Sequence, residues 1–411
     1  VGTILNVGLR YEDTDVDSAA FQAVPNTVLW IADNDFLLLY NDQNEDVTGS
    51  GSYDHWLPNI DLKFDLTEDL VARASWSKTI GRAPYNQLFA STTAQTPNRP
   101  TVLGGQTGGN SGSPGLEPLE STNWDVSFEW YFNDTGYVSV GYFHKSVKNF
   151  IGTGVFTRPL FDLLDPTAGN AGSRSGDSLD VIDGLGVDRS EANLFTMVAL
   201  IDANGGNVDA AAAEFEANLV GGALPQSYVD EIAGLYDVAG NSADALMQFR
   251  VSQPINDEKA KIDGWEFAGQ YFFGDSGFGI AGSYTIVNGD VDADPGQDPD
   301  ANEFALVGLS DTANVTLIYE NYGWEARVAY NWRDSFLNAT NQGGSRSPQY
   351  TDEYGQIDFN VTYAFNDQWS IMLDGINITG EDSRQYRRKE KMTVWAYELD
   401  SRYSLGVRYR F

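Results

Sequence analysis

The chain has 411 residues, 42 glycines, no cysteine and a formal net charge of −34 at pH 7. This acidic balance argues against a nucleic-acid partner, because phosphates are bound by Lys and Arg, and the absence of cysteine excludes disulfides and thiolate metal sites. No run approaches 18 apolar residues, so no transmembrane helix is expected, and the length suits two or three soluble domains or one large barrel.

Strand patterns occupy much of the first 150 residues. Apolar and polar side chains alternate over residues 1–11, 59–66, 70–77, 124–132 and 138–142. This period of two is typical of β-strands that have one apolar face and one face exposed to water. Val1 already lies inside such a pattern, so we expect a mature product or, more plausibly, a fragment.

Two long polar stretches separate these early strands. The acidic stretch over residues 12–51 carries one apolar cluster at 28–40, which is compatible with a hairpin above the membrane. Its apolar residues are assigned to loop packing rather than to a ligand contact. Residues 81–119 are rich in Gly, Pro, Ser, Thr and Asn and predict a long loop.

Residues 151–253 interrupt the strand pattern for about a hundred positions. Helical spacing occurs at 208–220 and again at 228–235. A segment of this length is too long for an ordinary loop, so we expect a subdomain or a functional lid with short helices.

Alternation resumes in the last third of the chain. The strands are expected at 265–273, 278–286, 313–319, 322–332, 357–365, 369–375 and 403–411, with short turns at 274–277, 320–321 and 366–367. The last strand places five apolar residues on one face and ends the chain on an aromatic residue. These five are Tyr403, Leu405, Val407, Tyr409 and Phe411.

About twelve strands joined alternately by short turns and long loops predict an all-β fold, a transmembrane antiparallel β-barrel with long extracellular loops. Aromatic residues gather beside the short turns, where amphipathic rings favour the boundary between hydrocarbon and water. We expect them to form a membrane girdle at the periplasmic rim. Its members are Trp130, Phe132, Tyr137, Tyr271, Phe273, Phe278, Tyr319, Trp324, Phe365 and Trp369.

Several segments resemble the TonB-dependent outer-membrane transporters of Gram-negative bacteria. They are residues 57–66, 75–82, 115–125, 261–266 and 406–411. Residues 251–256 and 329–333 are similar to the branch often associated with oligosaccharide uptake. The resemblance implies a 22-stranded barrel with a plugged lumen, of which this chain matches the C-terminal part.

The resemblance also implies a division of the chain and a set of partners. Residues 1–150 and 254–411 would form barrel strands, and 151–253 an extracellular loop or lid. The expected location is the outer membrane, in contact with lipid and lipopolysaccharide. A TonB complex would act through a plug region that this chain lacks, on an oligosaccharide or a siderophore, and a surface lipoprotein is a further expected partner.

Aromatic platforms on the outer loops would suit an oligosaccharide, because sugar faces stack on rings. The candidates are Tyr85, Phe89, Tyr350, Trp395 and Tyr397, each of which is also explained by loop packing. Lumen-facing Asp125, Glu129, Glu325 and Arg327 are interpreted as polar residues of the barrel wall.

No catalytic constellation or cofactor motif is recognisable, so we predict no enzyme. His55 and His144 are the only histidines and are interpreted as interfacial or lumen residues. Asp290, Asp292 and Asp294, with Asp298 and Asp300, form a weak calcium candidate. Pro295 and Ala301 stand where an EF-hand needs Gly and Glu, so a solvated acidic loop is favoured.

The basic run at 384–391 is expected on the outer rim, where solvation and contact with lipopolysaccharide phosphate or an anionic substrate are equally good explanations. Three functions remain open. They are TonB-dependent uptake of an oligosaccharide, with a ferric siderophore as the alternative substrate; a passive pore; and a surface-binding barrel that uses 151–253 as its adhesive unit.

Overall fold

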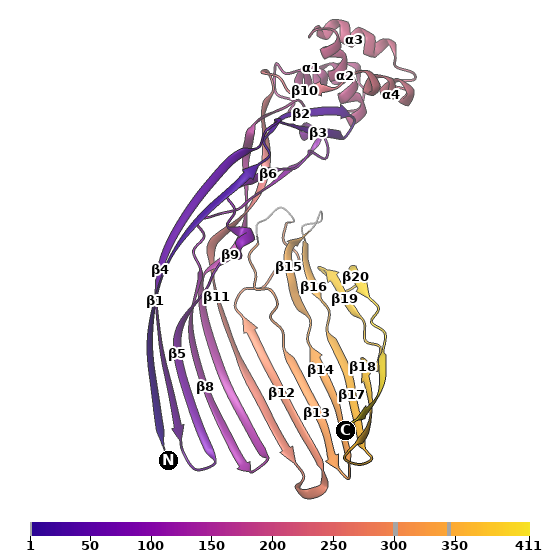
Figure 1. The fold of residues 1–411 in the computed structure, drawn as a ribbon. Coiled ribbons are helices and arrows are strands. Elements are labelled where there is room, and N and C mark those ends of the chain that lie inside the picture. Colours follow the sequence, from indigo (N-terminus) through magenta and orange to yellow (C-terminus); the bar gives the residue numbers. More distant parts are fainter. Residues whose placement is uncertain (1, 299–302, 343–346) are drawn as a thin grey trace.

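The computed structural model describes residues 2–298, 303–342 and 347–411. Twelve strands form one continuous antiparallel path in the order β1-β4-β5-β8-β9-β11-β12-β13-β14-β17-β18-β21 (Figure 1). Their bounds are Thr3–Gln22, Glu45–Asp65, Leu70–Gly81, Leu119–Asn133, Gly136–Asp165, Ala245–Phe272, Phe278–Gly289, Thr312–Asn321, Trp324–Arg333, Tyr354–Ala364, Trp369–Ile376 and Arg402–Tyr409. The fold is therefore the predicted all-β sheet.

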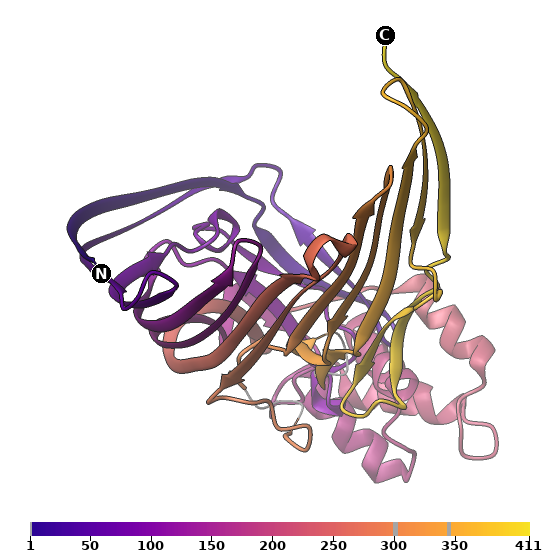
Figure 2. The same cartoon turned by 90° about the horizontal axis from the view of Figure 1, so that it is seen from below.

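The sheet curves without closing within the described residues. β1 pairs only with β4 and β21 only with β18, so each has a free edge in this part of the chain. Viewed from below, the two ends of the arc lie far apart (Figure 2). The short turns gather at one end of the sheet, where the N and C marks also lie (Figure 1).

The turn between β13 and β14 shows how local chemistry sets a hairpin. Tyr322 and Gly323 both have positive φ, 51° and 81°. Two such residues in succession form the two-residue turn that matches the twist of antiparallel strands. The predicted turn at 320–321 is therefore two residues too early, because Glu320 and Asn321 still pair with Glu325 and Trp324.

Four strands continue well beyond the predicted limits. β1 and β4 stay paired as far as Gln22 and Glu45, through a stretch expected to be loop. β9 runs to Asp165 and β11 starts at Ala245, so both enter the segment 151–253 that was expected to interrupt the strands. In β1 and β4 this outer part carries mainly polar residues, so the alternation that reveals a strand is lost there. In β11 the alternation persists at Met247, Phe249 and Val251, which are fully buried.

These long strands carry a compact unit, here called the head, made of residues 25–40 and 166–244. It contains the three-stranded sheet β10-β2-β3, with β2 at Pro25–Ala32, β3 at Asp35–Tyr40 and β10 at Val238–Ala239. Its helices are α1 Arg174–Leu185, α2 Glu191–Ala203, α3 Val208–Ala217 and α4 Gln226–Leu235. Of these, α3 and α4 match the predicted helices, whereas α1 and α2 were not anticipated.

Trp30, Phe195 and Phe215 are fully buried in the hydrophobic core of the head, which also takes in buried residues of β9 and β11. Ser173 and Ser190 cap α1 and α2 by accepting hydrogen bonds from the amides of Gly176 and Asn193. In the described residues, no helix has both the length and the apolar character needed to cross a membrane.

Shorter strands complete the outer end of the molecule. β6 Thr92–Ala94 and β7 Thr107–Ser111 lie within the predicted loop 81–119, and β7 pairs in parallel with β11. A separate sheet has the order β15-β16-β19-β20, with bounds Phe336–Gln342, Ser347–Thr351, Ser383–Arg387 and Thr393–Tyr397. The basic run at 384–391 thus forms one side and the turn of the β19–β20 hairpin.

Candidate functional site

The concave wall over β4, β5 and β8 is lined by charged residues. The Arg73 guanidinium donates two hydrogen bonds to Glu129, at 2.8 Å to Oε1 and 3.3 Å to Oε2. The Tyr131 hydroxyl donates to the same carboxylate at 3.0 Å. A bidentate pair of this kind holds both side chains in one orientation across neighbouring strands.

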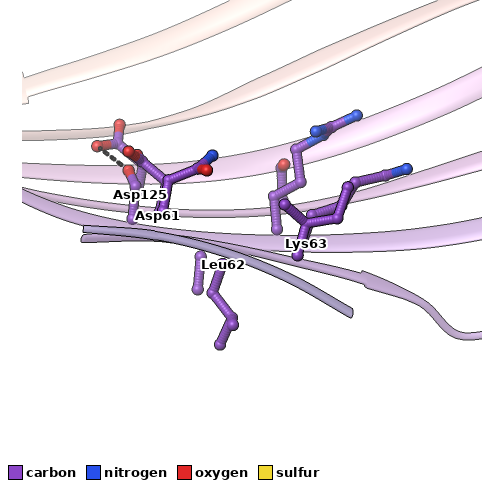
Figure 3. A pocket seen from close by; sticks show the side chains of 10 residues that line it. Asp61, Leu62, Lys63 and Asp125 are labelled. Carbon is purple, nitrogen blue, oxygen red and sulfur yellow. Dashed lines mark hydrogen bonds between the residues drawn. The ribbon is translucent and has the colours of Figure 1, made fainter. Parts of the chain in front are cut away.

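A pocket of about 380 Å³ lies on the same wall, next to this ion pair. Asp61, Lys63 and Asp125 point into it, whereas Leu62 points to the opposite face of the sheet (Figure 3). The Ser75 hydroxyl donates to Asp125 Oδ2 at 3.3 Å. The lining offers carboxylates, hydroxyls and a lysine, which can bond hydroxyl or amide groups of a passing solute.

The opposite face of the sheet is apolar and exposed. Val7, Leu9, Leu405 and Val407 are 65% to 71% exposed, although a protein in water usually buries such residues. The exposed apolar row continues across the strands, as in Trp124, Val126 and Phe128 of β8, which gives the sheet a surface suited to lipid.

The predicted girdle residues lie on strand ends beside the short turns. Ring contacts link neighbours across strands, at 5.7 Å for Phe132 and Tyr271 and 4.7 Å for Phe278 and Tyr319. Trp369 lies 4.6 Å from Tyr409 of the last strand. Nine of the ten stay candidate girdle residues on the apolar face, and their contact with lipid stays a prediction. Tyr137 is a correction, because its neighbour Val138 pairs with Trp130 on the apolar face, which places Tyr137 on the concave face, 5.9 Å from Tyr131.

A second aromatic row lies further along the strands and was missed in the sequence. Its ring pairs are Tyr11 with Trp56 at 4.8 Å, Trp76 with Trp124 at 6.1 Å, and Tyr142 with Trp265 at 5.1 Å. These rings come from mid-strand positions, and only the strand register brings them together. Two rows separated by an apolar band are typical of membrane barrels.

The five predicted platform residues do not form one surface. Tyr85 and Phe89 are exposed in the segment between β5 and β6. Tyr350 stacks on Tyr386 at 5.3 Å, and burial raises the pKa of the Tyr350 hydroxyl. Trp395, with Tyr397, belongs to the neighbouring strand β20.

Register separates Tyr350 from Trp395 and Tyr397, the other two predicted platform residues of that sheet. Tyr350 pairs with Tyr386, and Trp395 pairs with Gln385, which is the next residue along β19. Successive residues of a strand point to opposite faces, so Trp395 lies on the face away from Tyr350. Trp395 and Tyr397 are stacked at 6.2 Å and both are more than half exposed.

The histidines and the acidic loop have ordinary polar partners. His55 Nδ1 lies 3.6 Å from Glu120, which also accepts bonds from Lys78 at 3.1 Å and Lys148 at 3.2 Å. His144 pairs with Trp124 in the ladder and so lies on the apolar face, beside the second aromatic row.

In the acidic loop, the Asp290 carboxylate accepts a hydrogen bond from the backbone amide of Lys261, and the Asp294 carboxylate accepts one from the amide of Gly296. Asp300 and Ala301, on which the EF-hand comparison partly rests, lie outside the described residues. Within the described part of the chain, no group of three or more His, Asp or Glu residues is arranged to hold a metal ion.

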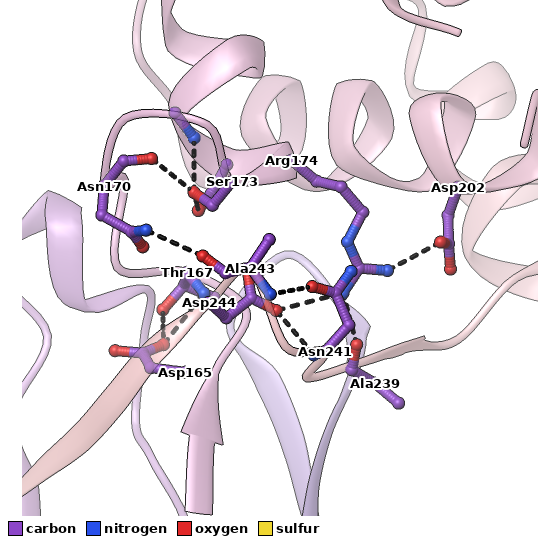
Figure 4. Close-up of polar contacts among 12 residues, drawn as sticks. Asp165, Thr167, Asn170, Ser173, Arg174, Asp202, Ala239, Asn241, Ala243 and Asp244 are labelled. Carbon is purple, nitrogen blue, oxygen red and sulfur yellow. Dashed lines mark hydrogen bonds and ion pairs between the residues drawn. The ribbon is translucent and has the colours of Figure 1, made fainter. Parts of the chain in front are cut away.

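A buried polar network joins the parts of the head (Figure 4). Arg174 of α1 lies 2.7 Å from Asp202 of α2 and 3.2 Å from Asp244, and it also donates to the carbonyl of Ala239. Asp165 accepts hydrogen bonds from the hydroxyls of Thr167 and Thr101. No local sequence pattern predicts this network, because it joins residues as far apart along the chain as Thr101, Arg174 and Asp244.

A tall antiparallel sheet with a polar concave wall, an exposed apolar outer face and two aromatic rows defines an outer-membrane β-barrel protein. The sequence model described as "TonB dependent receptor-like, beta-barrel" matches residues 3–378. The chain therefore belongs to the TonB-dependent receptor-like β-barrel family, and its location is the outer membrane of a Gram-negative bacterium.

Solved structures show the same fold at low sequence identity. The siderophore receptor PiuA of Acinetobacter baumannii is 12% identical with a TM-score of 0.51, over 99% of this chain and 40% of that one. The copper transporter OprC is 12% identical with a TM-score of 0.50, over 100% and 46%. A variant of the ferric enterobactin receptor PfeA of Pseudomonas aeruginosa, with enterobactin, is 13% identical with a TM-score of 0.50, over 99% and 51%.

The chain therefore spans about half or less of the length of these solved receptors. No curated protein sequence matches it.

Proposed function

We propose that this chain is the barrel part of a TonB-dependent receptor that takes up a nutrient across the outer membrane. The observation that carries the proposal is the two-faced sheet, whose apolar face suits lipid while Asp61, Lys63 and Asp125 line a wet concave wall (Figure 3). Such a wall gives a polar solute a path through hydrocarbon. Members of this family are transporters, so we propose no enzymatic activity for this chain.

Uptake of this kind would need more than barrel strands. We propose that a plug region and the TonB complex act together with this barrel, as in the family. Lipid and lipopolysaccharide would contact its outer face, and a surface lipoprotein remains a proposed partner. In that arrangement residues 151–253, which hold most of the head, would act as an extracellular lid.

For the substrate we propose an oligosaccharide. The support is the resemblance of residues 251–256 and 329–333 to the oligosaccharide branch, together with the exposed stack of Trp395 and Tyr397. Gln349 and Gln385 lie on the same face of that sheet and are hydrogen-bonded to each other at 2.6 Å. The flat aromatic rings can stack on the apolar faces of a sugar, and the side-chain amides can form hydrogen bonds with its hydroxyl groups.

A ferric siderophore is the second candidate, because two of the structural neighbours are described as a siderophore receptor and a ferric enterobactin receptor. The charge of this chain favours the sugar. A net charge of −34 repels anionic iron complexes and leaves neutral oligosaccharides unaffected.

The test is binding of neutral oligosaccharides and of ferric siderophores to the purified receptor in detergent. We expect sugar binding that the double variant Trp395→Ala/Tyr397→Ala weakens by roughly thirtyfold, since stacked rings contribute about 1 kcal/mol each. Tyr322→Ala, an exposed ring at a short turn, is the matched control and should bind like the parent. Sugar binding unchanged by the double variant would refute the platform, and siderophore binding alone would refute the substrate.

The remaining alternatives are a passive pore and a surface-binding barrel. Liposome swelling separates the passive pore from active uptake. A pore admits sugars without TonB or an energised membrane, whereas the proposed receptor admits none under those conditions. Passage of sugars into the liposomes under those conditions would refute the proposal of active uptake.

A further inference from the structure

The small sheet of the head is apolar on both faces. On one face Val28, Trp30 and Phe36 are buried in the core of the head. Register places the alternate residues on the other face, where Leu37 pairs with Leu29 and Leu39 with Thr27. Leu37 is 47% exposed and Leu39 is 42% exposed. The head lies beyond the barrel end of the long strands (Figure 1), so this second face is not explained by contact with lipid.

β3 is also the free edge of that sheet. The order is β10-β2-β3, and within the described residues β3 pairs only with β2. Native edge strands are usually protected from further pairing by Lys, Pro or a bulge. β3 reads Asp-Phe-Leu-Leu-Leu-Tyr, and the irregular positions of the ladder, Asn26 and Ile31, lie on β2. Its outer edge is therefore an open template for another strand.

The surroundings of this edge are strongly acidic. The head carries fifteen Asp and Glu residues against two arginines. Both arginines, Arg174 and Arg189, are already paired with aspartates. Burial raises the pKa of Asp33 beside β3, and the nearby carboxylates of Glu191, Asp230 and Asp35 raise it further. Glu191 already pairs with Arg99 from outside the head. Asp33, Asp35 and Asp230 still make the field at the end of β3 unfavourable for another anion and favourable for a cation.

From these observations we infer that β3 is a docking edge for a basic, extended polypeptide segment of a partner. The segment adds as a fourth strand to β10-β2-β3. Its backbone bonds the free edge of β3, its alternate apolar side chains cover Leu37 and Leu39, and its Lys or Arg residues meet the acidic rim. Backbone pairing with alternate side-chain contacts is an established mode of peptide recognition.

Charge selects this occupant over a second copy of the chain. Two heads brought together at β3 would place their carboxylate clusters against each other, and like charges in contact oppose association. A basic segment removes that repulsion. The inference concerns the head alone and holds for either proposed substrate of the barrel.

The test uses the whole chain in detergent and a short synthetic peptide of alternating Leu and Lys. We expect the peptide to bind and to protect the amides of Leu37 to Leu39 from hydrogen exchange. Leu37→Ser/Leu39→Ser should weaken binding about tenfold by removing apolar contact without changing charge. Asp33→Asn/Asp35→Asn should weaken it by a similar factor, and by less in high salt.

Controls separate this edge from general attraction to an acidic surface. Val220→Ser/Leu235→Ser removes two exposed aliphatic residues elsewhere on the head and should leave binding unchanged. A peptide alternating Leu and Glu should not bind. The inference is overturned if the β3 double variant, folded by its helical circular dichroism, binds like the parent. It is also overturned if the amides of β3 gain no protection, or if light scattering shows that β3 instead joins two copies of the chain.

Discussion

Arg174 joins separate segments of the head through one side chain. Only 10% of the side chain is exposed, and its partner Asp244 is fully buried. A buried pair of charges contributes little net stability, because both ions lose their water. Removing one partner is different, since the other charge is left buried without compensation.

We therefore predict that Arg174→Ala lowers the free energy of unfolding of the head by about 3–5 kcal/mol. The matched control is Arg189→Ala, which removes an exposed ion pair with Asp183 and should cost about 0–1 kcal/mol. Denaturant unfolding followed by helical circular dichroism measures both. Equal effects of the two variants would contradict the role given to Arg174.

Tyr228 links the stability of the head to high pH. Burial raises its pKa to about 12, and Glu214, whose carboxylate lies 3.4 Å from the hydroxyl, adds to the shift. The unfolded chain loses this proton near pH 10, whereas the folded head keeps it to about pH 12. The stabilising contribution is therefore complete below pH 10 and is lost as the pH rises through this window.

The expected result is that Tyr228→Phe makes the stability of the head depend less on pH between 10 and 12. Unfolding midpoints at a series of pH values provide the measurement. Tyr236→Phe, at an exposed tyrosine of the same region, serves as the control. Parallel pH profiles for Tyr228→Phe and the parent protein would show that Tyr228 is not responsible.

At the scale of the element, each barrel strand separates two environments with a period of two. In β13, Leu317 is 55% exposed on the apolar face. Thr316 is its neighbour on the other face, where it pairs with Ala281 and Ala329. The same substitution at these two adjacent positions therefore tests which face meets lipid.

For proteins refolded into vesicles, we predict that Leu317→Arg destabilises the barrel by about 1–3 kcal/mol, because a charge on the lipid face, between the girdle and mid-bilayer, loses hydration. Thr316→Arg should cost much less, since small neighbours and water surround that side chain. Reversible unfolding from vesicles gives both values. The two-faced assignment of β13 fails if Thr316→Arg proves the more harmful substitution.

The strands also show where sequence patterns stop being informative. Inside the band of exposed apolar residues, alternation gave the position of every barrel strand. Outside it, β1 and β4 continue with mainly polar residues, so the pattern fades although the backbone pairing does not. The outer part of β11 keeps a short alternation at Met247, Phe249 and Val251, which face the core of the head and were overlooked. Helices α1 and α2 were missed for a related reason. α2 is apolar nearly all round, from Leu194 to Ile201, and therefore lacks the one-sided periodicity of a surface helix.

On the scale of the whole molecule, charge and shape act together. The net charge of −34 is concentrated in the long loops and the head, which lie at the opposite end from the short turns (Figure 1). A bilayer with an anionic surface repels such a chain over about one Debye length, roughly 10 Å at 0.1 M salt.

Folding from urea into vesicles should therefore be slower and less complete when the vesicles contain anionic phospholipid than when they are zwitterionic. Added salt should restore most of the yield by screening the repulsion. The folded fraction can be followed by gel mobility without boiling. Equal yields in both kinds of vesicle at low salt would contradict this prediction.

By itself, the sequence determined the fold class, the number of barrel strands and the face of each side chain within them. These properties depend on local alternation, which is read along the chain one residue at a time. Only the tertiary structure decided which distant segments meet. It assembled the head from residues 25–40 and 166–244, gathered the second aromatic row, and placed Tyr350 and Trp395 on opposite faces of one sheet. The reason is physical, because cross-strand register and core packing depend on contacts between residues far apart along the chain, and local patterns do not encode those partners.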